Sequence, residues 1–376
     1  MSTADTNPEY WCEYSNLQHV KHALIREYLN GWFPKMTLGQ WGCSRLLYID
    51  THAGRGKHLN GQLGSPLVAL TTLLSHQWRD QILQKTEVRF FFIERDEQNV
   101  AALKQELAVR SLPQNVFAEA EHGDCFEIIE DVITTFEKDG KQLAPGFFFV
   151  DPYGFKLPGK LLRRLLDCPK VELFVNVIWR ELDMAIQKSR EDDGSGLTAT
   201  LNSVFDGDAW TKLCADDADA RAEQCADLFR AMTGARWGTH IRMRDNGRIR
   251  YFLLHLTKHD AGRDLMKECI WKACPDGGYY ASKSDNPRQQ LLIQLEPDFG
   301  PLRDWTIERL KVGPKYWQDL TKELREELWL TKHLNDVIRT MRKDKEIVAD
   351  GYTGSFAPKN NPLLHLSKRL EEFGLF

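Results

Sequence analysis

The chain has 376 residues, 42% of them hydrophobic and 28% charged, so it can bury a sizeable core and is not intrinsically disordered. Its formal net charge of −4 excludes a uniformly basic nucleic-acid-binding protein and leaves a local patch as the way to contact nucleic acid. The eight cysteines form no CxxC pair and no zinc-like spacing with histidine, and no apolar run approaches the about 18 residues of a membrane span. We therefore expect reduced thiols, no metal site, no membrane association and a cytoplasmic location.

The first half of the chain alternates between predicted strands and predicted helices. Apolar residues at three-and-four spacing predict a helix over residues 17–32, which Pro34 is expected to end. Apolar runs predict five strands, at 45–49, 88–93, 116–120, 146–150 and 172–177. Helical patterns lie between these strands, at 65–77, 98–111, 125–138 and 159–167. This alternation is typical of α/β proteins with a doubly wound, mostly parallel sheet of the Rossmann-like type.

The rest of the chain predicts a helical insertion and a second, smaller domain. Residues 180–235 are polar and helical in pattern, and a strand at 248–256 and a helix at 261–272 follow. A linker at 297–301 is expected to divide a domain over 1–296 from one over 297–376. The smaller domain is predicted to be winged-helix-like, with helices at 305–310, 316–328 and 331–343, Thr331 as an N-cap, and a hairpin of 346–349 and 354–356.

An acidic residue ends or follows each of the first four predicted strands. These residues are Asp50, Glu94, Asp124 and Asp151. Ligands of open parallel sheets bind at the carboxyl ends of the strands, so the four carboxylates are expected to gather at one ligand site. Each of them alone could instead be the N-cap of the following helix, where Asp is favoured. A ligand site explains the four together better than four separate caps do.

The turn after the first strand contains the short pattern Ala53-Gly-Arg-Gly56. Gly54 and Gly56 allow a tight turn and a close approach of a ligand to the backbone. The turn lacks both the G-x-G-x-x-G of dinucleotide-binding proteins and the Lys-Ser/Thr of a phosphate loop. A short glycine turn after a strand-end acid is typical of proteins that bind S-adenosylmethionine (SAM), which has no pyrophosphate.

We therefore predict SAM as the cofactor. Glu94 is expected to accept hydrogen bonds from the ribose hydroxyls, and Asp124 is expected to lie beside the adenine ring. The full set of predicted cofactor-binding residues is Asp50, Ala53, Gly54, Gly56, Glu94 and Asp124.

Several segments between residues 15 and 275 match a known pattern in order and spacing. The segments are 21–32, 48–56, 64–67, 92–96, 150–154 and 257–259, with Met266, Lys267 and Trp271. In these segments the chain resembles the three-Cys-motif partner protein (TcmP) family. The resemblance implies a methyltransferase-like fold and a partner that carries a three-cysteine motif. Thr51 and His52 depart from the small and aromatic residues expected at their positions.

The loop Asp151-Pro-Tyr-Gly154 carries the clearest chemical signal. It resembles the D/N-P-P-Y/F loop of adenine and cytosine amino-methyltransferases, and more closely the Asp-Pro-Phe-Gly loop of tRNA guanine-N2 methyltransferases. An exocyclic amine needs acceptors for its two hydrogens, which the Asp151 carboxylate and a backbone carbonyl fixed by Pro152 would supply. Tyr153 offers a ring on which a base can stack.

Asp151, Pro152 and Tyr153 are therefore the predicted catalytic residues. Asn176 and Arg180, after the fifth strand, are candidates for the same cleft. An ordinary Pro-Tyr-Gly turn and a solvated helix start are the structural alternatives.

The third helix of the smaller domain is predicted to present the basic residues Lys332, His333, Arg339, Arg342, Lys343 and Lys345. Of these, Lys332, Arg339, Arg342 and Lys343 are predicted to contact nucleic-acid phosphates. A packing or dimerisation domain is the alternative, because charged helix faces are usually only solvated.

The sequence thus predicts a SAM-dependent N-methyltransferase, or a methyltransferase-like protein, that acts on an exocyclic amine of a nucleic-acid base. Two alternatives stay open. The first is a non-catalytic partner protein that binds a protein or nucleic acid, and the second is a methyltransferase for a protein or small molecule. RNA or DNA and a three-cysteine-motif protein are the expected partners, and the oligomeric state is not predicted.

Overall fold

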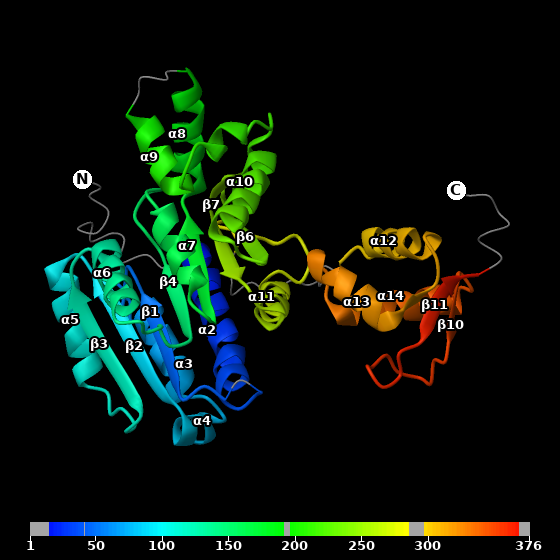
Figure 1. The fold of residues 1–376 in the computed structure, drawn as a ribbon, viewed down its shortest axis with the longest axis horizontal. Coiled ribbons are helices and arrows are strands. Elements are labelled where there is room, and N and C mark those ends of the chain that lie inside the picture. The colour runs from blue at the N-terminus through cyan, green and yellow to red at the C-terminus, as the bar shows by residue number, and fades with distance from the viewer. Residues whose placement is uncertain (1–14, 41, 192–195, 286–296, 368–376) are drawn as a thin grey trace. The chain divides into compact units, whose positions relative to one another are not determined.

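A computed structural model describes residues 15–40, 42–191, 196–285 and 297–367 (Figure 1). The chain divides into two compact units, one of residues 1–273 and 279–290, the other of residues 274–278 and 291–376. Each unit has its own hydrophobic core. The domain boundary predicted at residues 296 and 297 adjoins a segment outside the described residues and stays a prediction.

An eight-stranded sheet forms the centre of the first unit, in the order β3-β2-β1-β4-β5-β7-β6-β8. The strands are β1 (Arg45–Asp50), β2 (Glu87–Glu94), β3 (Val116–His122), β4 (Gly146–Val150), β5 (Val171–Val177), β6 (Trp237–Asp245), β7 (Arg248–Thr257) and β8 (Tyr280–Ser282). Strands β1 to β5 are parallel, and β7 is antiparallel to both β5 and β6. The predicted Rossmann-like, doubly wound and mostly parallel sheet is confirmed.

The direction of winding changes between β1 and β4, which are neighbours in the sheet but not in the chain. Such a switch point leaves a crevice at the carboxyl ends of the strands, where ligands of this fold bind. The turn after β1 and the loop after β4 both leave the sheet at this crevice. The two most informative sequence motifs are therefore brought together by topology alone.

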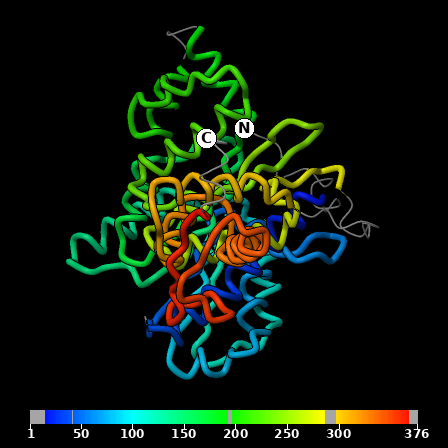
Figure 2. Tube along the Cα trace, turned by 90° about the vertical axis from the view of Figure 1, so that its right-hand side faces the viewer, coloured from blue at the N-terminus to red at the C-terminus, as the bar shows by residue number. Residues whose placement is uncertain are grey.

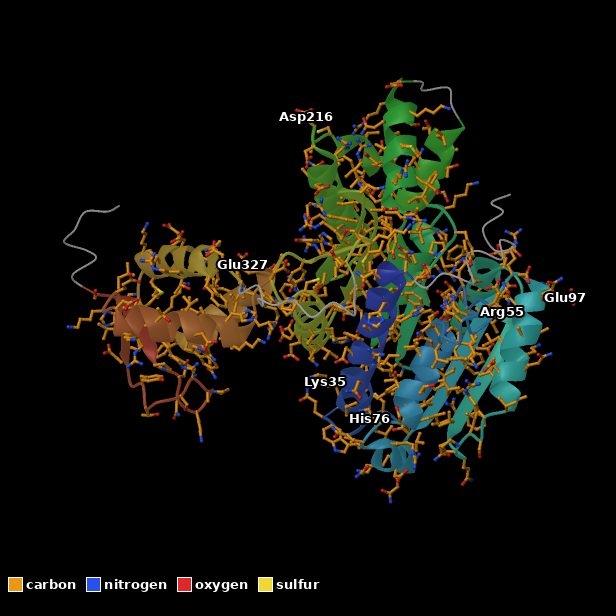
Figure 3. All side chains as sticks on the ribbon, turned by 180° about the vertical axis from the view of Figure 1, so that it is seen from behind. Lys35, Arg55, His76, Glu97, Asp216 and Glu327 are labelled. Carbon is orange, nitrogen blue, oxygen red and sulfur yellow. The ribbon has the colours of Figure 1, made fainter. Side chains whose placement is uncertain are left out.

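Helices cover both faces of the sheet (Figure 1). On one face, α2 (Asn16–Thr37) packs beside α3 (Ser65–Leu74) and α11 (Asp260–Ala273), and Figure 3 shows α2 lying across this face. On the other face, α6 (Cys125–Lys138) and α7 (Gly159–Asp167) share an apolar core with β4 and β5. Two further helices, α4 (Arg79–Lys85) and α5 (Glu97–Ala108), pack against α2 and against β2 and β3 respectively.

Helix α2 does not end at Pro34, contrary to the sequence prediction, but continues through it to Thr37. A proline inside a helix leaves the carbonyl four residues earlier without its usual N–H donor. Here the His76 ring nitrogen Nε2 lies 3.0 Å from the Asn30 carbonyl oxygen and replaces that donor. His76 lies near the Lys35 end of α2 in Figure 3. A partner distant in sequence thus stabilises the turn that proline weakens.

A helical extension follows β5 and comprises α8 (Trp179–Glu191), α9 (Leu197–Phe205), a 3-10 helix (Ala209–Lys212) and α10 (Ala218–Thr233). It occupies the region for which the sequence predicts a helical insertion. Helices α8 and α9 project beyond the sheet in both views of the trace (Figures 1 and 2). α8 begins directly at the carboxyl end of β5, so its first turn borders the crevice.

Strands β6 and β8 and helix α4 were not predicted from the sequence. In β6, buried and partly buried side chains alternate, but the buried position 239 holds the polar Thr239, which interrupts the apolar row of Trp237, Ile241 and Met243. The alternation that identifies a half-buried strand is therefore weak in the sequence. The strand is held in place by its antiparallel pairing with β7.

The second unit contains α12 (Gly300–Lys311), α13 (Trp317–Glu323), α14 (Thr331–Lys343) and the short strands β9 (Lys315–Tyr316), β10 (Ile347–Asp350) and β11 (Leu363–Leu366), with a 3-10 helix at Leu324–Glu326. The sheet order is β10-β11-β9, with antiparallel pairs. The strand that pairs with β10 is β11, not residues 354–356 as predicted. Helix α12 also begins inside the predicted linker.

The start of α14 differs from the prediction as well. Thr331 is the first residue of the helix rather than its cap, and the N-cap position is Leu330. The backbone N–H of Leu330 donates to Nδ1 of His333 at 3.3 Å. The assignment of this unit to the winged-helix class stays a prediction.

Candidate active site

Four polar side chains stand at the carboxyl ends of four neighbouring strands. Each follows an aromatic residue by two positions, and side chains two positions apart on a strand share a face. In sheet order they are Glu94 on β2, Asp50 on β1, Asp151 after β4 and Asn176 on β5, following Phe92, Tyr48, Phe149 and Phe174. Tyr48 contacts Phe92, and Phe149 contacts Phe174. Phe147 of β4 joins the two pairs and also contacts Tyr28 of α2. The strands thus carry a row of aromatic side chains and, two residues nearer their carboxyl ends, a row of polar side chains.

Asp50 is fully buried and holds the turn that follows β1. Its Oδ1 accepts from the His52 N–H at 3.3 Å, while Oδ2 has no hydrogen-bond partner within the described part of the chain. Burial raises the pKa of Asp50 to about 7, and a hydrogen bond with Ser65 opposes this rise. Asp50 therefore lies beneath the predicted cofactor turn rather than at its surface.

Glu94 binds the backbone of two neighbouring loops. Its Oε2 accepts from the Gly54 N–H at 2.7 Å, and its Oε1 accepts from the Asp96 N–H at 2.8 Å. The carboxylate therefore couples the glycine turn after β1 to the loop after β2.

Gly56 is required by the geometry of the turn. Its φ is +79°, in the left-handed region, and an added Cβ would lie 2.6 Å from the Leu103 Cδ1 atom. Gly54 also has a positive φ, of 60°. The neighbouring Ala53 is buried, and its N–H donates to the Ile93 carbonyl at 2.9 Å. These contacts explain the Ala53-Gly-Arg-Gly56 pattern.

Asp124 is the N-cap of α6, the structural alternative considered for every strand-end acid. Its Oδ1 accepts from the N–H groups of Phe126 and Glu127 at 3.0 and 3.4 Å. It does not line the cavity described below. Its predicted place beside an adenine ring stays a prediction.

Asp151 accepts hydrogen bonds from two donors that lie on different elements. The Lys21 ammonium of α2 donates to its Oδ2 at 2.6 Å, and the Asn176 amide of β5 donates to its Oδ1 at 2.5 Å. Burial alone would raise the pKa of Asp151, but the Lys21 charge and the two hydrogen bonds outweigh it and lower the pKa below its ordinary value. Asp151 is therefore an anion held in one orientation.

His52 lies between the two motifs and is uncharged. Its ring contacts the Tyr153 ring edge-on at a centroid distance of 6.2 Å, and its Nε2 lies 3.7 Å from the Cys125 sulfur. Burial lowers the pKa of His52 to about 4. Burial also raises the pKa of the Cys125 thiol to about 12, so Cys125 and His52 do not form a thiolate–imidazolium pair.

A cavity of about 850 Å³ opens where these groups meet. Of the predicted site residues, it is lined by Ala53, Gly54, Asp151, Pro152 and Tyr153, and not by Asp50, Gly56, Glu94 or Asp124. Asn176 and Arg180 also line it, as the sequence suggested. Pro152 is buried, whereas Tyr153 is 40% exposed at the rim. The volume lies within the range of about 300–1,000 Å³ typical of small-molecule sites.

The sequence analysis missed Lys21 as a site residue. It was noted only within the resemblance segment 21–32, and it reaches the site because α2 crosses the sheet above β4. Lys21 is only 7% exposed. Lysine is rarely buried without a partner, so its place among the apolar residues of a predicted helix was the signal that could have identified it.

On α14, the four predicted nucleic-acid contacts are not equivalent. Lys332 and Lys343 are exposed. Arg339 donates to Asp336 at 2.7 Å, and the Arg342 guanidinium lies 3.8 Å from the centre of the Tyr352 ring. His333, which the sequence predicted to be presented with them, is buried between Phe299 and Trp329. That part of the prediction was wrong, because His333 belongs to the apolar face of the helix.

The sheet order and the mostly parallel strands define a Rossmann-like α/β protein. No family model matches the chain, and no curated protein matches it. Among the solved structures, the chain is similar in fold to human methyltransferase-like protein 13 bound to S-adenosylhomocysteine (SAH), with 13% identity, 91% of this chain and 97% of that chain covered, and a TM-score of 0.33.

Two bacterial structures are also similar. An O-methyltransferase from Bacillus cereus bound to SAH has 10% identity and a TM-score of 0.31, with 69% of this chain and 92% of that chain covered. A Legionella pneumophila protein of the family DUF519 has 14% identity and a TM-score of 0.35, with 63% and 85% covered. At these scores the similarities carry no argument about function, which has to come from the site.

Within the described ranges, no helix is long and apolar enough to cross a membrane. The same residues contain no group of three or more His, Cys, Asp or Glu side chains arranged to hold a metal ion.

Proposed function

We propose that the cavity binds SAM. Ala53 and Gly54 line the cavity and would lie against the cofactor, and Gly56 keeps the turn tight enough for close approach. Glu94 lies behind Gly54 and outside the cavity lining, and we propose that it turns to accept from the ribose when the cofactor binds. The fit is supported by the Gly54–Glu94 hydrogen bond, which brings the glycine turn and the strand-end carboxylate into contact before any ligand binds. Bound SAM would supply an electrophilic methyl group on a sulfonium sulfur: the N–C bond forms as the S–C bond breaks, SAH is released, and the strongly acidic proton of the methylated nitrogen passes to water or to the Asp151 carboxylate.

The reaction that the site supports best is methylation of an exocyclic amine of a nucleic-acid base. The observation that carries this proposal is the fixed Asp151 anion in the cavity, next to the exposed Tyr153 ring. A carboxylate can accept from an amine N–H and so orient its nitrogen. Tyr153 would stack on the base, an interaction worth about 1–3 kcal/mol per base by alanine substitution.

Asp151 acts in this proposal by orientation and not as a strong base. Its pKa is held below the ordinary value by Lys21, so it stays ionised but has little tendency to take a proton. The neutral His52 ring has a pKa of about 4 and is likewise a weak base at neutral pH. The site therefore suits an amine that is already neutral, such as the exocyclic amine of a base.

A non-catalytic role is the second candidate. It is favoured by Glu94, whose two oxygens already bind backbone N–H groups, and by Asp124, which serves as a helix cap. In that role the protein would bind a three-cysteine-motif protein or a nucleic acid without turnover. Methylation of a protein or small molecule is the remaining alternative.

Calorimetric titration with SAH tests the cofactor proposal. The wild-type protein is expected to bind SAH with one-site stoichiometry, and Glu94→Ala is expected to bind it at least tenfold more weakly, since a hydrogen bond to a charged group contributes about 1.5–3 kcal/mol. Glu121→Ala, which removes an exposed carboxylate near the end of β3, is the matched control and should bind normally. Absence of SAH binding to a folded wild-type protein would reject the proposal in favour of the non-catalytic role.

A further inference from the structure

The side-chain amide of Asn176 has a defined orientation. Asn176 lies one residue before the end of β5 and is only 5% exposed. Its Nδ2 donates to Asp151 Oδ1 at 2.5 Å. An ionised carboxylate can only accept hydrogen bonds, so the amide nitrogen must face Asp151, and the amide oxygen Oδ1 is directed away from it.

That Oδ1 atom is buried and has no hydrogen-bond partner within the residues that the structure describes. Leaving a buried acceptor unpaired destabilises the fold, and a leucine of the same branched shape would avoid this at a purely structural position. Asn176 also lines the cavity beside Asp151. The unpaired acceptor thus belongs to a residue of the cavity wall.

We propose that Asn176 Oδ1 accepts a hydrogen bond from the substrate amine, as the second of two acceptors beside Asp151. This inference rests on the proposed function. The Lys21 and Asn176 donors occupy two of the about four lone-pair sites of the Asp151 carboxylate, so Asp151 can still accept one amine hydrogen. Asn176 Oδ1 takes the other hydrogen, the role that the sequence analysis gave to a backbone carbonyl fixed by Pro152.

Two adjacent acceptors select the chemical class of the substrate. A primary amine brings two N–H donors and matches both, whereas a hydroxyl or thiol brings one hydrogen and would leave one buried acceptor unpaired. The pair therefore favours an exocyclic –NH₂ group, as in adenine, cytosine or guanine, over an oxygen or sulfur nucleophile.

Asn176→Leu tests the amide as a whole, because it keeps the branched shape of the side chain and removes both the Oδ1 acceptor and the Nδ2 donor to Asp151. The measurement is the rate of tritiated-methyl transfer from SAM to heat-denatured DNA and total RNA, together with SAH affinity by calorimetry. We expect the rate to fall by about 10²-fold with SAH affinity unchanged. Asn99→Leu is the matched control: it removes another buried amide with an unpaired atom, outside the cavity lining, and should keep the wild-type rate.

Asn176→Asp separates positioning from simple packing. Its carboxyl, when protonated, can donate to Asp151 in place of the amide N–H while it still offers an acceptor oxygen. The activity of Asn176→Asp is therefore expected to rise as the pH falls from 8 to 6, whereas that of Asn176→Leu should stay low throughout. A packing role predicts no such pH dependence.

The results distinguish this inference from the proposed function. Wild-type transfer together with an unimpaired Asn176→Leu variant would overturn the inference alone, and so would a rate loss matched by an equal loss of SAH affinity. If the wild type binds SAH but transfers no methyl group, the proposed function fails. The acceptor is then tested by the affinity of the SAH complex for a mixed-sequence single-stranded DNA. About tenfold weaker binding by Asn176→Leu would support it, and equal binding would overturn it.

Discussion

Lys21 determines whether the Asp151 carboxylate is charged. Burial favours the protonated form of Asp151, and the Lys21 ammonium 2.6 Å away reverses that preference. In Lys21→Met the burial effect is opposed only by Asn176 and by the smaller influence of His52, so the pKa of Asp151 should rise above that in the wild type. Activity that needs the Asp151 anion should then be lost at lower pH and recover as the pH rises.

The measurement is the pH dependence of kcat/KM for methyl transfer between pH 5.5 and 8.5. The wild type is expected to show no ionisation of Asp151 in this range, whereas Lys21→Met should show a single-proton rise with pH. Lys21→Arg keeps the positive charge and should behave like the wild type in profile, though at a reduced rate because its planar fork differs from an ammonium. Parallel profiles for wild type and Lys21→Met would show that Lys21 does not control the charge of Asp151.

Lys21 also marks the limit of what single residues reveal before the fold is known. The strand-end acids and the Asp151-Pro-Tyr-Gly154 loop could be identified because each lies next to a recognisable strand. Lys21 lies far from them in the chain and reaches Asp151 only because α2 crosses the sheet. Likewise, the cap role of Asp124 and the buried position of Asp50 depend on contacts that the sequence does not specify.

At the scale of elements, apolar periodicity predicted β1 to β5 and most helices to within a few residues, because buried parallel strands have continuous apolar runs. The errors occurred where tertiary contacts override local preference. Helix α2 passes through Pro34 because His76 satisfies the Asn30 carbonyl. Strand β6 depends on pairing with β7 more than on its own apolar pattern.

Helix α14 is the element through which we propose that the second unit contacts nucleic acid. Its exposed Lys332 and Lys343 are better candidates for phosphate contacts than Arg339 and Arg342, which bind Asp336 and Tyr352. The double variant Lys332→Glu with Lys343→Glu should weaken binding of single-stranded DNA. Each lost phosphate contact should also reduce the slope of log affinity against log salt by about 0.7.

Fluorescence anisotropy over a series of salt concentrations measures both effects. Lys104→Glu with Lys138→Glu changes the net charge equally at exposed positions of the first unit and serves as the control. An equal decrease in both double variants would indicate a general charge effect and remove α14 from the proposed interface.

At the scale of the whole molecule, the central claim is that the crevice of the Rossmann-like unit transfers a methyl group from SAM to an amine oriented by Asp151. The most direct measurement is tritiated-methyl incorporation from SAM into RNA, DNA and protein fractions by the full chain, with the wild type and Asp151→Ala compared at equal SAH affinity. The account predicts incorporation into nucleic acid by the wild type and a loss of about 10²–10³-fold in Asp151→Ala. Incorporation that Asp151→Ala leaves unchanged, or no incorporation into any fraction by a wild-type protein that binds SAH, would contradict it.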